Sequence, residues 1–311
     1  MKHESILGCI GGTPLVGVHA LSPNPDVRIY AKLEGQNPGG SSKDRIALKM
    51  VEMAERDGFL QPGDTILEPS SGNTGIGLAL VAKLRGYRLR VVMPDNVSVE
   101  RRQLLEIFGA EVVSSPGEEG SNGGIRLAEK LALEDPALKL LFQYGNPANP
   151  LAHYEGTGPE ILHDCPEVDV FVAGLGTSGT LMGVGRYLKE HKPGVQVVAV
   201  EPPAGELVQG LRSLDDGFVP PIFDGGILDR KLIVRPRQSI EWVRRLLDEA
   251  GVFAGISSGA AVAGAVKMAA TMDSGTIVTL LPDGGWKYLS SGAWTDDLDI
   301  VEERATRINY W

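Results

Sequence analysis

The sequence predicts an α/β protein made of two doubly wound domains. Its 311 residues exceed the length of one ordinary domain and suit two. Short apolar runs typical of strands alternate with longer segments whose apolar residues recur at helical spacing, an order that indicates parallel sheets. Glycine-rich loops follow several of these strands, and such loops at strand ends commonly form ligand sites in α/β proteins.

The first half of the chain repeats a unit of strand, loop and helix. Residues 27–33 alternate sides like a strand, and apolar residues over 44–56 recur at helical spacing until Gly58 ends the helix. Further strands are expected at 65–67, 90–93, 111–113 and 138–143, with helices at 76–84, 98–108 (capped by Ser98) and 125–133. Residues 117–124 are expected to form a polar, glycine-rich connector.

The second half continues the alternation after a break at 145–150, Gly-Asn-Pro-Ala-Asn-Pro. Strands are expected at 168–173, 195–200, 231–234 and 276–281, with helices at 154–162, after 180 to 189, at 239–249 and within 255–269. Residues 202–229 form a long loop of the kind that usually carries function. We place a smaller, mobile domain at 41–147 and a larger domain at 1–40 and 148–311.

The composition indicates a protein that acts on small molecules. A net charge of -10, without a basic stripe, argues against nucleic-acid binding. The N-terminus is polar and no apolar run is long enough to cross a bilayer, so we expect a cytoplasmic protein. Cys9 and Cys165 lack CxxC spacing and the five histidines show no HxxxH pair, so neither a metal site nor a disulfide framework is indicated.

A glycine-rich loop presents Lys43 at the start of an expected helix. Gly39 and Gly40 make the loop backbone permissive, and Ser41 and Ser42 are candidate N-caps. The positive end of the helix dipole disfavours an ammonium group there. An amine whose working form is uncharged, as in covalent binding of a carbonyl cofactor, explains this placement, so we predict that Lys43 is catalytic.

Three further loops place hydroxyl groups at helix starts. Residues 176–180 follow a hydrophobic strand and form a candidate phosphate site. Because GxGxxG spacing and a Walker lysine are both absent, a single terminal phosphate fits better than a dinucleotide. Residues 70–75 form a second anion site, suited to a carboxylate, and residues 255–260 form a third loop. Each loop alone is also explained as an ordinary turn or serine cap.

Together, these loops and one lysine are what a phosphate-bearing aldehyde cofactor requires. The segments NPGGSSKDR, EPSSGNTGIGLAL, GNPANP with GTGPEI, GTSGT and GISSGAA occur in that order. In them the chain resembles the pyridoxal-phosphate enzymes of the cysteine synthase group, which have fold type II with a tryptophan synthase β-like architecture. The resemblance extends from Gly12 to Ser290, nearly the whole chain.

The resemblance implies a role for each motif residue. Lys43 would bind pyridoxal 5'-phosphate covalently and move the proton at the substrate Cα. Asn73 would hydrogen-bond the cofactor's ring oxygen, and Ser257 would face its pyridine nitrogen. A neutral hydroxyl at that nitrogen moderates the electron sink and favours β-elimination over transamination. Gly176, Thr177, Ser178, Gly179 and Thr180 would hold the phosphate, and Ser70, Ser71, Thr74 and Gln143 would bind the substrate carboxylate as the smaller domain closes.

The implied reaction is cysteine synthesis from an O-activated L-serine and a sulfur donor. Arg212 resembles the arginine that B-type and phosphoserine-dependent enzymes place toward the substrate side chain, where a guanidinium can hold a phosphate. A solvated loop arginine is the alternative. The runs at 100–111 and 284–292 also look more like phosphoserine-using enzymes, so O-phospho-L-serine is favoured over O-acetyl-L-serine.

Two further functions are compatible with these motifs. Cystathionine β-synthase, which joins L-serine and homocysteine, shares several motifs, including the run at 149–154, although GTGPEI is more typical of cysteine synthase. A catalytically silent binding protein is the alternative of another class. The presence of Lys43, Asn73 and Ser257 together argues against it, because a silent scaffold does not need the lysine.

Departures from the family pattern concern the substrate more than the cofactor. Ser70 stands where threonine is usual, and Ser178 where glycine or threonine is usual. The aromatic C-terminus, Tyr310 and Trp311, is expected by default to fray; covering the active-site mouth and packing on a neighbouring subunit are the alternatives. The family suggests a homodimer, and sulfide, thiosulfate or a thiocarboxylated carrier protein are the candidate sulfur donors.

Overall fold

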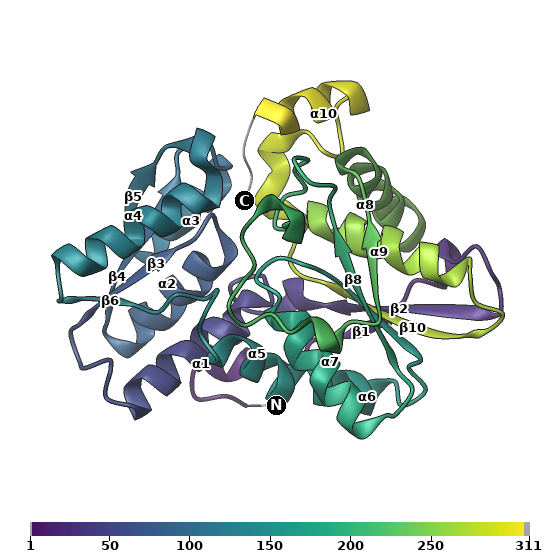
Figure 1. Ribbon diagram of the computed structural model, residues 1–311, viewed down its shortest axis with the longest axis horizontal. Coiled ribbons are helices and arrows are strands. Elements are labelled where there is room, and N and C mark those ends of the chain that lie inside the picture. Colours follow the sequence, from purple (N-terminus) through teal and green to yellow (C-terminus); the bar gives the residue numbers. More distant parts are fainter. Residues whose placement is uncertain (1, 308–311) are drawn as a thin grey trace.

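The computed structural model describes residues 2–307, and two β-sheets organise them (Figure 1). The larger sheet has the order β1-β2-β10-β7-β8-β9 and the smaller one β5-β4-β3-β6. All paired strands are parallel except β1 and β2. The expected α/β fold with two parallel sheets is confirmed. The predictions for Tyr310 and Trp311 concern residues outside the described part.

The strands of the larger sheet are β1 (Leu15–Gly17), β2 (Val27–Leu33), β7 (Val170–Gly174), β8 (Gln196–Glu201), β9 (Arg230–Ile233) and β10 (Gly275–Leu281). Those of the smaller sheet are β3 (Thr65–Pro69), β4 (Arg88–Pro94), β5 (Glu111–Ser115) and β6 (Leu138–Leu140). The helices are α1 (Lys43–Arg56), α2 (Asn73–Arg85), α3 (Val99–Phe108), α4 (Gly120–Glu134), α5 (Ala148–Ala152), α6 (Gly158–Asp164), α7 (Gly179–His191), α8 (Pro236–Ala250), α9 (Ile256–Ala269) and α10 (Leu298–Arg307).

Both faces of the larger sheet are buried, as its nearly continuous apolar strands predict. In β7, Val170 and Val172 pack with residues of α9, whereas Phe171 and Ala173 pack with residues of α6 and α7. Figure 1 shows α8 and α9 on one side of this sheet and α6 and α7 on the other. This arrangement is doubly wound and directs the strands' carboxyl ends toward the smaller sheet.

The smaller sheet is covered in the same way. Ile66 and Val91 pack with residues of α1, α2 and α3, whereas Leu67 and Val92 pack with residues of α4. All four strands come from one continuous part of the chain, 65–140, and the larger sheet comes from segments before and after it. The domain boundaries at 41 and 147 and the mobility of the smaller domain stay predictions.

Two local expectations were wrong, and a third was confirmed only in position. The strand expected at 138–143 ends at Leu140, because Phe142 has a φ of +56°, outside the β region. Helix α4 begins at Gly120 rather than 125, so residues 120–124 are helical and not a connector. Ser98 is the N-cap residue of α3, but its hydroxyl donates to the carbonyl of Lys287 at 3.1 Å and caps no helical N–H.

The helix expected at 154–162 is part of a longer helical run. Helix α5 continues through a π-helical turn, His153–Thr157, directly into α6. Such π turns are frequent at functional sites, and this one places His153 beside Thr180, in the first turn of α7. Within residues 2–307 no helix combines the length and the apolar character needed to cross a bilayer.

Candidate active site

A cavity opens at the carboxyl ends of β3, β7 and β10, where parallel α/β sheets usually bind their ligands. It collects nearly all the residues that the sequence singled out: Lys43, Ser70, Ser71, Asn73, Thr74, Gln143, Gly176, Thr177, Ser178, Thr180, Arg212 and Ser257. Of the predicted set only Gly179 does not line it, although it is buried at the start of α7. Segments from both sheets therefore meet at one site.

The cavity is a cationic site in an acidic protein. Lys43, Arg101 and Arg212 line it, and its described lining residues include no aspartate or glutamate. The chain as a whole has a net charge of -10. Charges of one sign inside a concave surface attract ligands of the opposite sign, so this cavity suits molecules with phosphate or carboxylate groups.

Lys43 is the first residue of α1, as predicted. The N-cap is Ser42, whose side chain makes no capping bond, while the Ser41 hydroxyl accepts from the Lys43 N–H at 3.2 Å. Burial lowers the pKa of the Lys43 amine, and the carboxylates of Asp283 and Glu34 oppose the decrease. An amine with a lowered pKa is more readily uncharged at neutral pH, as a nucleophile or general base requires.

The 176–180 loop has the properties of a phosphate site. Ser178 is buried with a φ of +70°, and its hydroxyl has no hydrogen-bond partner within the described residues. A buried, unpartnered hydroxyl beside the N-terminus of α7 is suited to an oxyanion. A Cβ at Gly176 would lie 2.7 Å from the Gly210 carbonyl oxygen, so the loop needs glycine there.

Residues outside the loop hold its hydroxyl groups. Asn149 donates through Nδ2 to the Thr177 hydroxyl at 3.0 Å and to the Gln143 carbonyl at 2.9 Å. The Nδ1 atom of His153 lies 2.9 Å from the Thr157 hydroxyl, and its Nε2 atom lies 3.2 Å from the Thr180 hydroxyl. Burial, together with the charges of Lys43 and Arg45, lowers the pKa of His153 well below its usual value. A neutral imidazole therefore orients Thr180.

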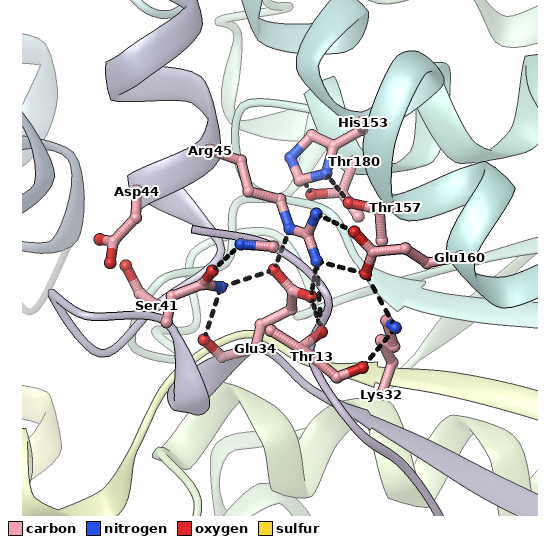
Figure 2. A network of polar contacts seen from close by, with 12 residues as sticks. Thr13, Lys32, Glu34, Ser41, Asp44, Arg45, His153, Thr157, Glu160 and Thr180 are labelled. Atoms are coloured by element: carbon pink, nitrogen blue, oxygen red, sulfur yellow. Dashed lines mark hydrogen bonds and ion pairs between the residues drawn. The ribbon is translucent and has the colours of Figure 1, made fainter. Parts of the chain in front are cut away.

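A buried ionic network anchors the first turn of α1 (Figure 2). Arg45, two residues after Lys43, donates to Glu34 at 2.7 and 2.8 Å and to Glu160 at 2.6 and 2.7 Å. Lys32 donates to the carbonyl of Thr13 at 2.5 Å and pairs with Glu160 at 2.9 Å. The network joins α1 to β2 and α6 and so fixes the helix that carries Lys43.

Asn73 lies between Asp283 and Lys287, two residues of the C-terminal part of the chain that sequence reasoning missed. Its Nδ2 donates to Asp283 at 2.7 Å, and its Oδ1 accepts from the Lys287 amine at 2.8 Å. Lys287 also donates to the Gly39 carbonyl, so it touches the lysine loop as well. Burial lowers the pKa of Lys287 to about 8, against the opposing charges of Asp283 and Asp44.

The 70–75 loop also lines the site. The Ser70 hydroxyl accepts from the N–H groups of Gly72 and Gly75 at 3.2 and 3.0 Å and shapes the entry to α2. The Thr74 hydroxyl donates to Gln143 Oε1 at 2.6 Å. This bond joins two side chains that the sequence assigned to one task, although they are far apart in the chain. Ser257 lies in the first turn of α9, also at the cavity.

Arg212 is buried, so it is not a solvated loop residue. Its Nη1 donates to Asn122 Oδ1 of α4 at 3.2 Å. Its guanidinium carbon lies 4.5 Å from the ring centre of Phe218 and 5.5 Å from that of Tyr144. Two aromatic rings and an amide hold the guanidinium at the cavity.

Arg101 places a second buried guanidinium at the cavity, beside that of Arg212. Sequence reasoning did not single out this residue. It donates to the Ser71 carbonyl at 3.4 Å and to Gln209 Oε1 at 3.3 Å. Its guanidinium carbon lies 4.7 Å from the ring centre of Tyr288. Arg101 lies in the run at 100–111, whose likeness to phosphoserine-using enzymes does not indicate that this arginine is buried at the cavity.

Residues 6–283 match the protein family described as "Pyridoxal-phosphate dependent enzyme". The chain belongs to this family. The cationic cavity, the amine of Lys43 and the unpartnered hydroxyl of Ser178 fit pyridoxal phosphate, which has an aldehyde and a phosphate. When bound, this cofactor supplies an electron sink for charge that develops at the substrate Cα.

Two cysteine synthases are similar to nearly the whole chain of this pyridoxal-phosphate enzyme. It is 44% identical to the cysteine synthase of Staphylococcus aureus over an alignment of 304 residues that covers 94% of this chain and 98% of that protein. It is 41% identical to cysteine synthase B of Pseudomonas aeruginosa over 295 residues, with the same shares covered.

Solved structures agree in fold. The structure of O-ureido-L-serine synthase has a TM-score of 0.90 and 42% identity, covering 96% of this chain and 97% of that one. Cysteine synthase of Entamoeba histolytica has a TM-score of 0.89 and 35% identity, covering 99% and 96%. The expected fold type II architecture and the cysteine synthase relationship are confirmed, while the individual residue roles stay predictions.

Proposed function

We propose that this enzyme makes L-cysteine by replacing the side-chain leaving group of an O-activated L-serine with sulfur, and that it prefers O-phospho-L-serine to O-acetyl-L-serine. The observation that carries the preference is the burial of Arg101 and Arg212 at a cavity whose described lining residues include no carboxylate. A phosphate leaving group is dianionic and accepts several hydrogen bonds from guanidinium groups, whereas an acetyl ester is neutral and offers a carbonyl.

Each part of the site has a task in this proposal. The substrate carboxylate binds Ser70, Ser71, Thr74 and Gln143. Lys43, as an uncharged amine, would remove the proton at Cα and later return one. Ser257 would present a neutral hydroxyl to the cofactor's ring nitrogen, which would favour loss of a β-leaving group over transamination. The 176–180 loop would hold the cofactor's phosphate, and Asn73 would hydrogen-bond its ring oxygen.

The relatives support chemistry on O-substituted L-serine. A lysine-to-alanine variant of O-ureido-L-serine synthase was solved with O-ureido-L-serine bound, and that structure has a TM-score of 0.88 to this chain with 43% identity. The named cysteine synthase relatives support sulfur as the incoming group. Sulfide is the simplest donor to test first, followed by thiosulfate and a thiocarboxylated carrier protein.

The deciding experiment compares the two serine donors. The cofactor-loaded enzyme is assayed for cysteine formed from sulfide and either donor, and kcat/KM is expected to be at least about tenfold higher with O-phospho-L-serine. Arg212→Ala should reverse the preference, whereas Arg230→Ala, which changes an exposed arginine of β9, should not. An unchanged ratio of the two kcat/KM values in Arg212→Ala would remove Arg212 from its proposed role.

A parallel assay with L-serine and homocysteine separates cysteine synthesis from cystathionine synthesis and from silent binding. Product formed from L-serine and homocysteine, without cysteine from sulfide, would favour cystathionine β-synthase. A cofactor-loaded protein that forms neither product would favour a silent binding protein.

A homodimeric assembly and a cytoplasmic location, both expected from the sequence, remain predictions. Light scattering of the purified protein and fractionation of the cells that make it are the measurements that test them.

A further inference from the structure

Backbone strain is concentrated at the active site. Two residues other than glycine have a positive φ within the described chain, Phe142 at +56° and Ser178 at +70°. Ser178 belongs to the phosphate loop, and Phe142 directly precedes Gln143, which lines the same cavity. A bulky residue in the left-handed region is costly and persists only where its surroundings enforce it. The contacts that enforce it at Phe142 are therefore informative.

One buried carboxylate holds the strained segment. Glu68, in β3, has no exposed surface. Its Oε2 accepts from the N–H of Phe142 at 2.8 Å, and its Oε1 accepts from the N–H of Gln143 at 3.0 Å. Each oxygen of one side chain thus binds one of two consecutive amides. The Phe142 carbonyl accepts from the N–H groups of Gly145 and Asn146, which closes the turn on its other side.

We propose that Glu68 is a positioning residue for the substrate site. By binding two consecutive amides it holds Phe142 in the left-handed conformation and thereby places the side chains of Gln143 and Tyr144 at the cavity. The proposal rests on the proposed function, in which Gln143 binds the carboxylate of the amino-acid substrate. It adds a residue that does not line the cavity and acts through the backbone.

The segment that Glu68 holds serves both ends of the substrate. Gln143 accepts from Thr74 at 2.6 Å and donates to the Pro69 carbonyl at 3.2 Å, which fixes its amide beside the 70–75 loop. The next residue, Tyr144, has its ring centre 5.5 Å from the guanidinium carbon of Arg212. A displaced turn would therefore disturb the carboxylate end and the leaving-group end together.

The chemistry of the contact explains why a carboxylate stands there. Burial raises the pKa of Glu68 to about 8, and the N–H groups of Gln143 and Phe142, which favour the ionised form, oppose the increase. Glutamine has the same size but offers one carbonyl oxygen, so its NH₂ group would face a backbone N–H. Glu68→Gln therefore keeps the packing and removes half of the contact.

The test measures binding of L-serine to the cofactor-loaded enzyme through the change in cofactor absorbance. Gln143→Ala serves as the reference variant and should weaken binding. Glu68→Gln should raise the Kd for L-serine about tenfold, as expected when a buried backbone N–H loses its hydrogen-bond acceptor, with the affinity for the cofactor unchanged. Adding Phe142→Gly should restore most of the L-serine affinity, because glycine adopts a positive φ without strain. Adding Phe142→Ala, which also deletes the ring but keeps the strain, should not.

Each contrary result has a distinct meaning. An unchanged Kd in folded Glu68→Gln, or equal rescue by glycine and alanine, overturns the positioning role. No effect of Gln143→Ala overturns the carboxylate assignment and the positioning role with it. Because L-serine binding needs no turnover, failure of both donors in the cysteine assay is a separate outcome that concerns the reaction alone. If the single variant Glu68→Gln does not fold, the double variant with Phe142→Gly is tested instead. The proposal requires this double variant to fold and bind L-serine. A double variant that does neither overturns the proposal.

Discussion

The side-chain amide of Asn73 donates a hydrogen bond of 2.7 Å to Oδ2 of Asp283, a residue 210 positions later in the chain. Lys287 binds the oxygen of the same amide at 2.8 Å. Since an ammonium only donates and a carboxylate only accepts, these partners define which end of the amide is nitrogen. One N–H group of the Asn73 amide therefore remains to donate to the ring oxygen of the cofactor, which Asn73 is expected to bind.

Replacing Lys287 with methionine should weaken cofactor binding about fivefold, because the Asn73 amide loses the bond that fixes its orientation. Titration of the cofactor-free protein with pyridoxal phosphate gives the Kd, and thermal unfolding of the same samples checks that the fold is retained. Lys287→Arg is the matched control, since it keeps a cationic donor. Equal affinities for wild type and Lys287→Met would show that Asn73 needs no such support.

Changing Lys43 to alanine should abolish covalent attachment of the cofactor. After reduction with borohydride, the wild-type peptide that contains Lys43 should gain the mass of the cofactor less one water and plus two hydrogens, and the variant should show no modified lysine. Lys49→Ala, which changes a later residue of the same helix, should behave like wild type. A wild-type protein that stays colourless with added pyridoxal phosphate would contradict the assignment.

Replacing Ser178 with glycine should have opposite effects on the free and the loaded protein. Removing the Cβ relieves the strain of the positive φ, worth about 1 kcal/mol, so the cofactor-free protein should be more stable. Losing the hydroxyl should raise the Kd for pyridoxal phosphate about tenfold. Ser178→Ala should weaken binding without the gain in stability. Unfolding and cofactor titrations of both variants test this, and identical stabilities would contradict the strain.

The Glu160 carboxylate should make stability dependent on pH under acidic conditions. Burial raises its pKa, but hydrogen bonds from Arg45, Gly12 and Lys32 outweigh burial and hold the pKa at about 2, below the ordinary 4.5. A lowered pKa means that the stabilisation is present above about pH 4.5 and is lost as the pH falls toward 2, with up to about 3 kcal/mol at stake.

Urea unfolding of cofactor-free wild type and Glu160→Gln at about pH 7, 4.5 and 3 measures this contribution. The difference in unfolding free energy should be largest at neutral pH and shrink at the most acidic pH. Glu249→Gln, which removes an exposed i,i+4 pair with Arg245, is the control and should change stability little at any pH. A difference for Glu160→Gln that does not vary with pH would show that the carboxylate contributes no charge-dependent stabilisation.

The sequence predicted those site residues that lie in loops with a local signature. Lys43 was found because glycines and a helix start surround it, and the 176–180 loop because it joins a buried strand to a helix. Local sequence could not reveal Arg101 as a cavity residue, since arginines are usually exposed on helices. Its burial depends on Tyr288 and Gln209, which come from distant parts of the chain.

Residue patterns alone predicted the alternation of strands and helices, the family resemblance, and the lysine and glycine loops of the site. These follow from periodicity and from backbone conformations that few residues allow. The contacts of Asp283 and Lys287 with Asn73, and the hydrogen bond from the Phe142 N–H to Glu68, appear only in the folded chain. The reason is that buried polar groups need hydrogen-bond partners, and the fold supplies these partners from residues that are distant in sequence. No local sequence pattern identifies such partners.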